Sequence, residues 1–451
     1  MFASSNSHPK AGKLGTIQTE ADRCLSAIKE NHFSTITCDE KLIHRDKSKL
    51  PFAISPTQDK VMAKNCYDRF KKITKMARLM GAFCGADVIK PNYKMNPLTW
   101  LVIFAINAFF GCTIYTIYMG MVVDGDWKVL LQALSLAGSA VQGYSKLILC
   151  IYRRLVMISM DQQLNNIYKE YQNDKDYITI LRYRTDLATK MLKTVMGVYI
   201  VLVSTIIMYP LIYGLLYNQK MFVMQFLLPG IDPSTQFGYI LHNVVHVCLM
   251  ILGGFGNFAS DLYTCIFIIN IPLLKDILKI KFEKLNQVAL NCRDTKKTLP
   301  LLMEIVEWHQ NYNTFVQQVE EVYYGIIFIQ VVSSVVSICG TLFSIVIRSW
   351  PAAFAYLLLS TITLYAYCGL GNLVEISNDE VINIIYCDCL WYELSVPEQK
   401  IIILMIRKAQ KPLTLTIGHV MPLSMSTALQ LTKAIYSYMM MLVNFLKMDD
   451  I

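Results

Sequence analysis

Histidine, cysteine and acidic side chains are best suited to catalysis or metal binding, and few of them have the spacing that such chemistry needs. His242 and His246 are one helical turn apart, so both imidazoles could reach one metal ion, but no third ligand is apparent. The alternative is a contact between helices. Cys387 and Cys389 form a CxC pair rather than a metal-binding CxxC pattern, and we interpret both as core or interface cysteines. We therefore expect no metal and no cofactor.

Sequence signatures of enzymes are also missing. The chain contains no HExxH zinc motif, no GxSxG nucleophile elbow and no phosphate-binding loop. The formal net charge of +9 could suggest nucleic acid, but Lys and Arg gather in particular segments rather than in a basic stripe with interleaved aromatics. We expect neither an enzyme nor a nucleic-acid-binding protein.

Two ionisable residues, Lys146 and Asp261, interrupt long apolar stretches. An ionisable group at membrane depth is a candidate for function. The other interpretations are a side chain that snorkels to the membrane surface and an ion pair between helices. The C-terminal region holds a second pattern, because Ser437, Met441 and Asn444, with Phe445, share one face of a helix. That face could also serve simply for packing between helices.

The elements that must position these residues are membrane spans. Of the 451 residues, 54% are hydrophobic and 17% are charged, too few charges to cover the surface of a soluble protein of this length. A span needs roughly 20 apolar residues. Seven stretches satisfy this length: 98–123, 128–152, 194–217, 239–269, 322–347, 352–374 and 423–446.

The charges between the spans predict the orientation. Lys and Arg are frequent in the N-terminal region, in 153–193 and after the fourth span, whereas the links 124–126, 218–238 and 348–351 hold at most one basic residue each. Basic residues favour the cytosol. The N-terminus is therefore expected in the cytosol and the C-terminus outside, the reverse of a G-protein-coupled receptor. No internal repeat or pair of broken helices favours a transporter.

The last third of the chain carries an ordered set of motifs. It begins with a Tyr-x-x-x-Gly-Asn pattern at Tyr367, Gly371 and Asn372. Taken with the inverted topology, the set resembles the insect odorant receptor family over residues 60–451. The related gustatory receptors are the alternative, although their Thr-Tyr and Gln-Phe pairs in the final helix read Ser-Tyr and Asn-Phe here. The further pieces of the set are Glu375, the segments 386–391 and 407–412, Ser437, Tyr438, Leu228, Pro229, Pro233, Tyr239 and Asp261.

The resemblance implies an all-α membrane protein with seven transmembrane helices and a tetrameric channel. An odour-tuned subunit would assemble with the odorant receptor co-receptor of the family, in the plasma membrane of olfactory sensory neurons, and gate a non-selective cation current. The last helix of each subunit would line the pore. Met441 and Phe445 would form its apolar constriction, and Ser437 and Asn444 would add polar groups. A gustatory-type channel and a G-protein-coupled receptor are the alternatives.

The composition and periodicity of the chain, together with the resemblance, divide it into parts, and the resemblance locates a ligand site. The parts are a largely disordered tail (1–58), a membrane-associated amphipathic helix (59–96), spans one to six with cytosolic extensions (97–375), a cytosolic anchor (376–422) and the pore helix with a short outer end (423–451). A small, volatile, apolar odorant would bind in the outer half of the bundle. Interfacial tyrosines can instead be membrane anchors. The candidate pocket residues are Ser135, Gly138, Thr205, Tyr209, Tyr213, His242, His246 and Tyr356.

Overall fold

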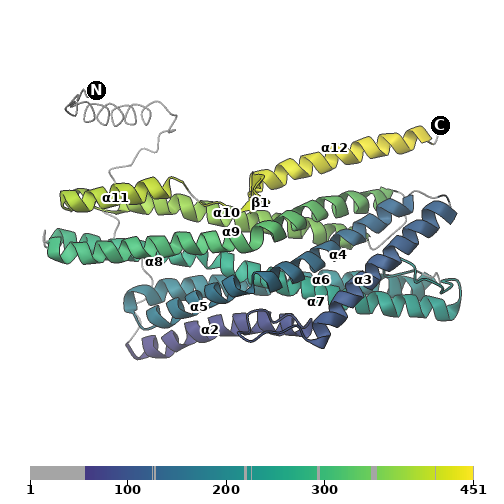
Figure 1. The fold of residues 1–451 in the computed structure, drawn as a ribbon, viewed down its shortest axis with the longest axis horizontal. Helices are drawn as coiled ribbons and strands as arrows, with labels where there is room; N and C mark the ends of the chain where they lie inside the picture. The colour runs from purple at the N-terminus through teal and green to yellow at the C-terminus, as the bar shows by residue number, and fades with distance from the viewer. Residues whose placement is uncertain are drawn as a thin grey trace, which may run out of the picture. The chain divides into compact units, whose positions relative to one another are not determined.

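The computed structural model describes residues 56–123, 125, 128–217, 221–224, 226–291, 295–346, 353–411 and 413–449. These residues are almost entirely helical (Figure 1). The predicted tail lies outside them except for residues 56–58, which begin the first described helix.

The helices follow one another in chain order, with one short hairpin before the last. They are α2 (Pro56–Phe83), α3 (Pro97–Tyr118) with a π-helical turn η3 (Met119–Val123), α4 (Lys128–Tyr152), α5 (Arg154–Tyr171), α6 (Lys175–Tyr217), α7 (Gln236–Ile269), α8 (Ile271–Asn291), α9 (Thr295–Val346), α10 (Ala353–Asn383), the turns η4 (Ile384–Asp388) and η5 (Trp391–Glu393), α11 (Val396–Ala409), the hairpin β1 (Thr416–Ile417) and β2 (Met421–Pro422), and α12 (Met425–Asp449).

All seven predicted spans are helical in the part of the chain that the structure describes, except that the last begins at Met425 rather than at residue 423. Five described helical stretches are long and apolar enough to cross a bilayer: Pro97–Val123, Lys175–Tyr217, Gln236–Asn291, Thr295–Val346 and Ala353–Asp388. The other two predicted spans are α4 and α12, each 25 residues long. Polar residues, such as Gln142 and Lys146 in α4, lower the hydropathy of these two helices.

Two spans continue without a break into the adjoining polar stretches. Helix α6 has 43 residues and α9 has 52. At 1.5 Å per residue, α9 is roughly 78 Å long, well over twice the thickness of the hydrocarbon core. It contacts α4, α8, α10 and α12 and is thus the central helix of the bundle. Beyond the spans it packs on α8, where Ile277, Phe282 and Leu285 are fully buried.

Helix α2 packs on the chain itself. Phe70, Ile73 and Ala77 are buried against α5, α6 and α7, and the Phe70 ring stacks on Tyr168 with centroids 4.3 Å apart. This supports the packing role that apolar stripes often have. The helix ends at Phe83, and the remainder of the segment 59–96 consists of turns and loop. The turn after it needs a positive φ of 71° at Gly85, a conformation that glycine adopts at little cost.

A tight hairpin connects α11 to the last helix. Gly418 and His419 both have positive φ angles, 60° and 61°, as a type I′ turn requires. Glu320 of α9 accepts a hydrogen bond from the backbone N–H of Thr416 at 3.0 Å, and the His419 ring stacks on Tyr324. Helix α12 starts against α9 and α10, and its C-terminal half extends away from the other helices (Figure 1).

Candidate functional site

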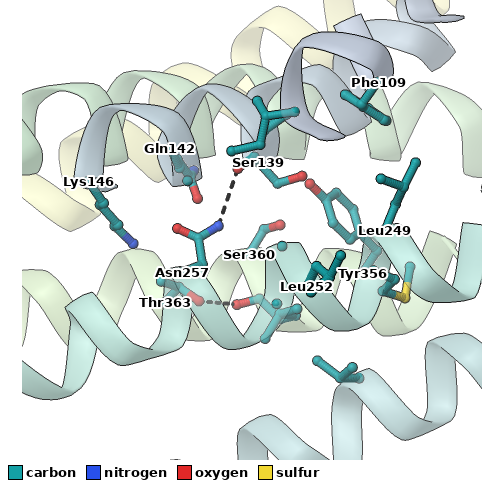
Figure 2. A pocket seen from close by; sticks show the side chains of 18 of the residues that line it. Phe109, Ser139, Gln142, Lys146, Leu249, Leu252, Asn257, Tyr356, Ser360 and Thr363 are labelled. Atoms are coloured by element: carbon teal, nitrogen blue, oxygen red, sulfur yellow. Dashed lines mark hydrogen bonds between the residues drawn. The ribbon is translucent and has the colours of Figure 1, made fainter. Parts of the chain in front are cut away.

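A cavity of about 170 Å³ lies among six helices of the bundle (Figure 2). An apolar cavity of about 150 Å³ is large enough to bind benzene, so this one can enclose a small organic molecule. Each helix contributes side chains to its wall: Val102 from α3, Ser139 from α4, Tyr199 from α6, Leu249 from α7, Gln330 from α9 and Tyr356 from α10.

One part of the cavity wall is apolar. Phe109, Ile206, Met224, Leu249 and Met250 line it, and the Phe109 ring packs edge-on against Phe226 with centroids 5.2 Å apart. Methionine side chains are flexible and polarisable, so they adapt to ligands of different shape. This part of the wall suits the hydrocarbon body of a ligand.

The opposite part of the wall is polar. The Asn257 side-chain amide donates a hydrogen bond to the Ser139 carbonyl at 3.2 Å (Figure 2). The Gln142 side-chain amide donates to the backbone carbonyl oxygen of Gln330 at 3.4 Å and to the Ser334 hydroxyl at 3.3 Å. Amide and hydroxyl groups from α4, α7 and α9 thus converge where a polar group of a ligand could be oriented.

An ion pair forms the floor of this polar part. Lys146 Nζ lies 2.5 Å from Asp261 Oδ1, and only 2% of the lysine side chain is exposed. The Tyr367 hydroxyl donates a second hydrogen bond to the same carboxylate oxygen at 2.5 Å. The interpretation of Lys146 and Asp261 as an interhelical pair is therefore confirmed. The pair joins α4, α7 and α10 beneath the cavity.

The described loop residues 221–224 and 226–228 cover the outer side of the cavity and are held by histidines. His242 Nε2 accepts from the Leu228 N–H at 2.9 Å, while its Nδ1 lies 2.7 Å from the Gly238 carbonyl. His246 Nδ1 accepts from the Met224 N–H at 3.3 Å, and its Nε2 lies 3.1 Å from the Phe226 carbonyl. Each imidazole must be neutral to accept on one nitrogen and donate from the other.

The two histidines thus connect a helix and a loop, which supports the contact role over the metal-binding one. Among the described residues, no group of three or more His, Cys, Asp and Glu side chains could hold a metal ion. Asn243 and Thr116 add to the closure, because their side-chain oxygens accept from the Val223 and Leu227 N–H groups at 3.1 and 2.8 Å.

The eight predicted pocket residues fall into three groups. Tyr356 lines the cavity. The two histidines and Gly138 are buried beside it; a Cβ at Gly138 would lie 2.3 Å from the Ser337 hydroxyl, so this glycine permits close packing of α4 on α9. Thr205, Tyr209 and Tyr213 lie on a more exposed face of α6 and are not among the lining residues, so their role stays a prediction. The side chain of Ser135 lies outside the described residues.

Several lining residues were not predicted from the sequence. Helix α6 presents Tyr199, Val203 and Ile206 to the cavity, and the polar wall comes from Gln142, Asn257 and Gln330. The sequence does contain a signal for Gln142, Asn257 and Gln330, because each is a polar side chain within an apolar span, where polar groups are rare.

The predicted pore residues lie on an exposed face of α12. Ser437, Met441 and Asn444 are exposed in the single chain, with 63% of the Met441 side chain accessible. The side chain of Phe445 lies outside the described residues. An apolar residue exposed on an extended helix requires lipid or another subunit to cover it.

Comparisons with known proteins give one family. A family model described as 7tm odorant receptor matches residues 126–436. A putative odorant receptor 83c of Drosophila melanogaster is 28% identical over 83% of this chain and 97% of that protein, and odorant receptor 22c of the same species is 23% identical over 48% and 55%. The olfactory receptor OR5 of Machilis hrabei, solved in complex with eugenol, superposes with a TM-score of 0.67 at 13% identity, over 85% of this chain and 99% of that one. A second structure of the same receptor superposes with a TM-score of 0.65.

Proposed function

This chain belongs to the 7tm odorant receptor family, and on that premise we propose that it is the odour-tuned subunit of a ligand-gated cation channel. The fold is that of an all-α, multi-pass membrane protein with seven spans. The observation that carries the proposal is the cavity among α3, α4, α6, α7, α9 and α10, with one apolar and one polar wall. A molecule enclosed there contacts helices that also position α12.

The proposed ligand is a small, volatile, largely apolar odorant. The cavity volume of about 170 Å³ and its wall of Phe109, Met224, Leu249 and Met250 favour such a molecule over an ion or a peptide. A solved relative of the same fold has been obtained in complex with eugenol. The loop held by His242 and His246 would close the outer end of the site and limit the access of water.

The proposed channel is a heterotetramer with the family co-receptor in the plasma membrane of olfactory sensory neurons. The cytosolic placement of the N-terminus rests on the basic residues of 153–193 and of α8. The exposed face of α12 would line the central pore, with Met441 and Phe445 as its apolar constriction and Asn444 as a polar group near passing ions.

A continuous set of contacts could transmit ligand binding to α12. Asp261, on the floor of the cavity, accepts a hydrogen bond from Tyr367 of α10. One turn further along α10, Gly371 lies so close to the hairpin that a Cβ would be 2.0 Å from the Leu423 carbonyl oxygen. Leu423 stands two residues before α12 begins. A shift of α10 would therefore move the base of the proposed pore helix.

Gating by this route must follow linkage. A ligand opens the channel only by binding the open state more tightly, and a nearly complete shift requires roughly 10⁴-fold preference. Since a small apolar ligand offers few contacts, the closed and open states must differ by only a few kcal/mol. We therefore expect brief openings without ligand in long single-channel records, and complete silence would contradict this mechanism.

The pore assignment is tested by charge placement. Asn444→Asp in the complex with the co-receptor should raise the permeability to divalent relative to monovalent cations, because the carboxylate would face the ion path. The matched control is Met439→Asp, which places the same charge at least about 120° around the helix from each of the proposed pore residues. Surface labelling would confirm that both variants reach the membrane. Equal effects of the two substitutions, or none, would refute the pore-facing position of Asn444.

A further inference from the structure

Two buried amide oxygens in the polar part of the cavity have no hydrogen-bond partner among the described residues. They are Oδ1 of Asn257 and Oε1 of Gln330. Both side chains line the cavity, and only 1% of Gln330 is exposed. A buried acceptor that lacks a donor is costly, and native proteins leave few of them.

The hydrogen bond of the Asn257 amide nitrogen fixes which atom of that side chain is left unpaired. Asn257 Nδ2 donates to the Ser139 carbonyl oxygen at 3.2 Å (Figure 2), so a flipped amide would place two acceptors against each other. Gln330 Nε2 donates to the Ser334 hydroxyl at 3.2 Å. The Asn257 oxygen therefore remains to be satisfied from the cavity. The Ser334 hydroxyl can donate as well as accept, so the Gln330 oxygen is unpaired in the side-chain orientation that the structure shows.

We propose that this cavity selects ligands that carry a hydroxyl group, small aliphatic alcohols or phenols, whose O–H donates to Asn257 or Gln330. The inference rests on the proposed function, which makes the cavity the odorant site. The hydrocarbon body of the alcohol lies along Phe109, Leu249 and Met250. The hydroxyl points toward the floor formed by Lys146 and Asp261.

Other common odorant groups match this wall less well. Esters, ketones, aldehydes and ethers only accept hydrogen bonds, so they leave both amide oxygens unpaired. A carboxylate also only accepts, and it would approach the Asp261 charge. A protonated amine donates, but it would add a positive charge beside the buried Lys146. A hydroxyl donates one hydrogen bond and still accepts others, without adding a charge.

Pairs of isomeric ligands, an alcohol and an ether of the same formula, test the contribution of the hydroxyl donor alone. We would measure the current of the complex with the co-receptor under n-octanol against methyl heptyl ether, and under phenethyl alcohol against benzyl methyl ether. The members of each pair have the same formula, so size and apolar surface barely change. The alcohol should be at least about tenfold more potent than its isomer, since only the alcohol satisfies a buried acceptor. Equal potency, or an advantage of the ether, would overturn the proposal.

Substitutions then locate the preference. Asn257→Leu and Gln330→Met nearly keep the side-chain shape but remove the acceptor, so the alcohol-to-ether ratio should fall toward one in at least one of them. Val203→Ala is the control, because it removes only apolar contact with the cavity and should weaken both isomers alike. A ratio that stays at its wild-type value in both acceptor variants would reject these two oxygens as the contact.

The outcome also separates this inference from the proposed function. If only odorants that lack a donor open the channel, the channel stands and the hydroxyl selectivity is wrong. If no odorant of any class produces a current from a complex that reaches the cell surface, the proposed function itself fails, and the selectivity falls with it.

Discussion

Replacing Lys146 by Met should strongly destabilise the protein, because it leaves the Asp261 carboxylate without its cation. The two charged atoms are 2.5 Å apart, and the side chains of Lys146 and Asp261 are 2% and 17% exposed. Removing one member of a buried pair typically costs about 3–5 kcal/mol. We expect a value near the lower end, about 3 kcal/mol, because Tyr367 continues to donate a hydrogen bond to Asp261.

A double-mutant cycle tests whether the pair acts as a unit. The free energy of unfolding would be measured in mixed micelles for Lys146→Met, Asp261→Leu and the double variant. The double variant should be more stable than either single variant, since two apolar groups leave no buried charge. The resulting coupling energy should be at least about 2 kcal/mol. Lys400→Met, at an exposed site, is the matched control and should change the free energy by no more than about 0.5 kcal/mol.

Two results would refute this reasoning. A loss below about 1 kcal/mol for Lys146→Met would mean that water solvates the pair as it does at a protein surface. Additive single effects would mean that Lys146 and Asp261 contribute independently, and that no floor joins α4 to α7.

Three further predictions follow from other contacts. His246→Leu should release the outer loop by removing two of its hydrogen bonds, seen as faster extracellular proteolysis; an unchanged rate would contradict that role. Gly371→Ala should reduce surface expression severalfold, because the added Cβ would meet the Leu423 carbonyl oxygen. Gly369→Ala is the control, because Gly369 has open space around it, and its expression should not change. Equal expression of the two variants would exclude the clash. Burial lowers the pKa of His309 from 6.5 to about 4, so the unfolded chain takes up the proton at a higher pH than the folded chain. The free energy of unfolding should therefore fall by up to about 3 kcal/mol as the pH drops from 6.5 to about 4. His309→Gln should flatten this dependence of stability on pH, and an unaltered slope would refute the assignment to His309.

The spans could be predicted from the sequence because their length and apolarity are set by the bilayer. The predicted stretch 128–152 coincides with α4, and 239–269 falls within α7. The ends of α6 and α9 could not be predicted, since an amphipathic stretch and an apolar stretch join in one helix with no capping residue between them.

The orientation of each span about its axis was harder to predict. A helix that is apolar on all sides gives no pattern that separates the lipid-facing side from the cavity-facing side. On α6 the tyrosines at 209 and 213 suggested one face, whereas Tyr199, Val203 and Ile206 line the cavity. The spacing of His242 and His246 likewise fits a metal site and hydrogen bonds to a loop equally well. Only the hydrogen-bond partners seen in the structure distinguish the two roles.

The most direct test of the proposed function is the whole-cell current of cells that express this chain with and without the family co-receptor, under a broad odorant panel. We predict a rapid cation current that needs both proteins and persists when G-protein signalling is blocked. A slow response abolished by that block would contradict the channel, and it would also reverse the membrane orientation inferred from the basic residues.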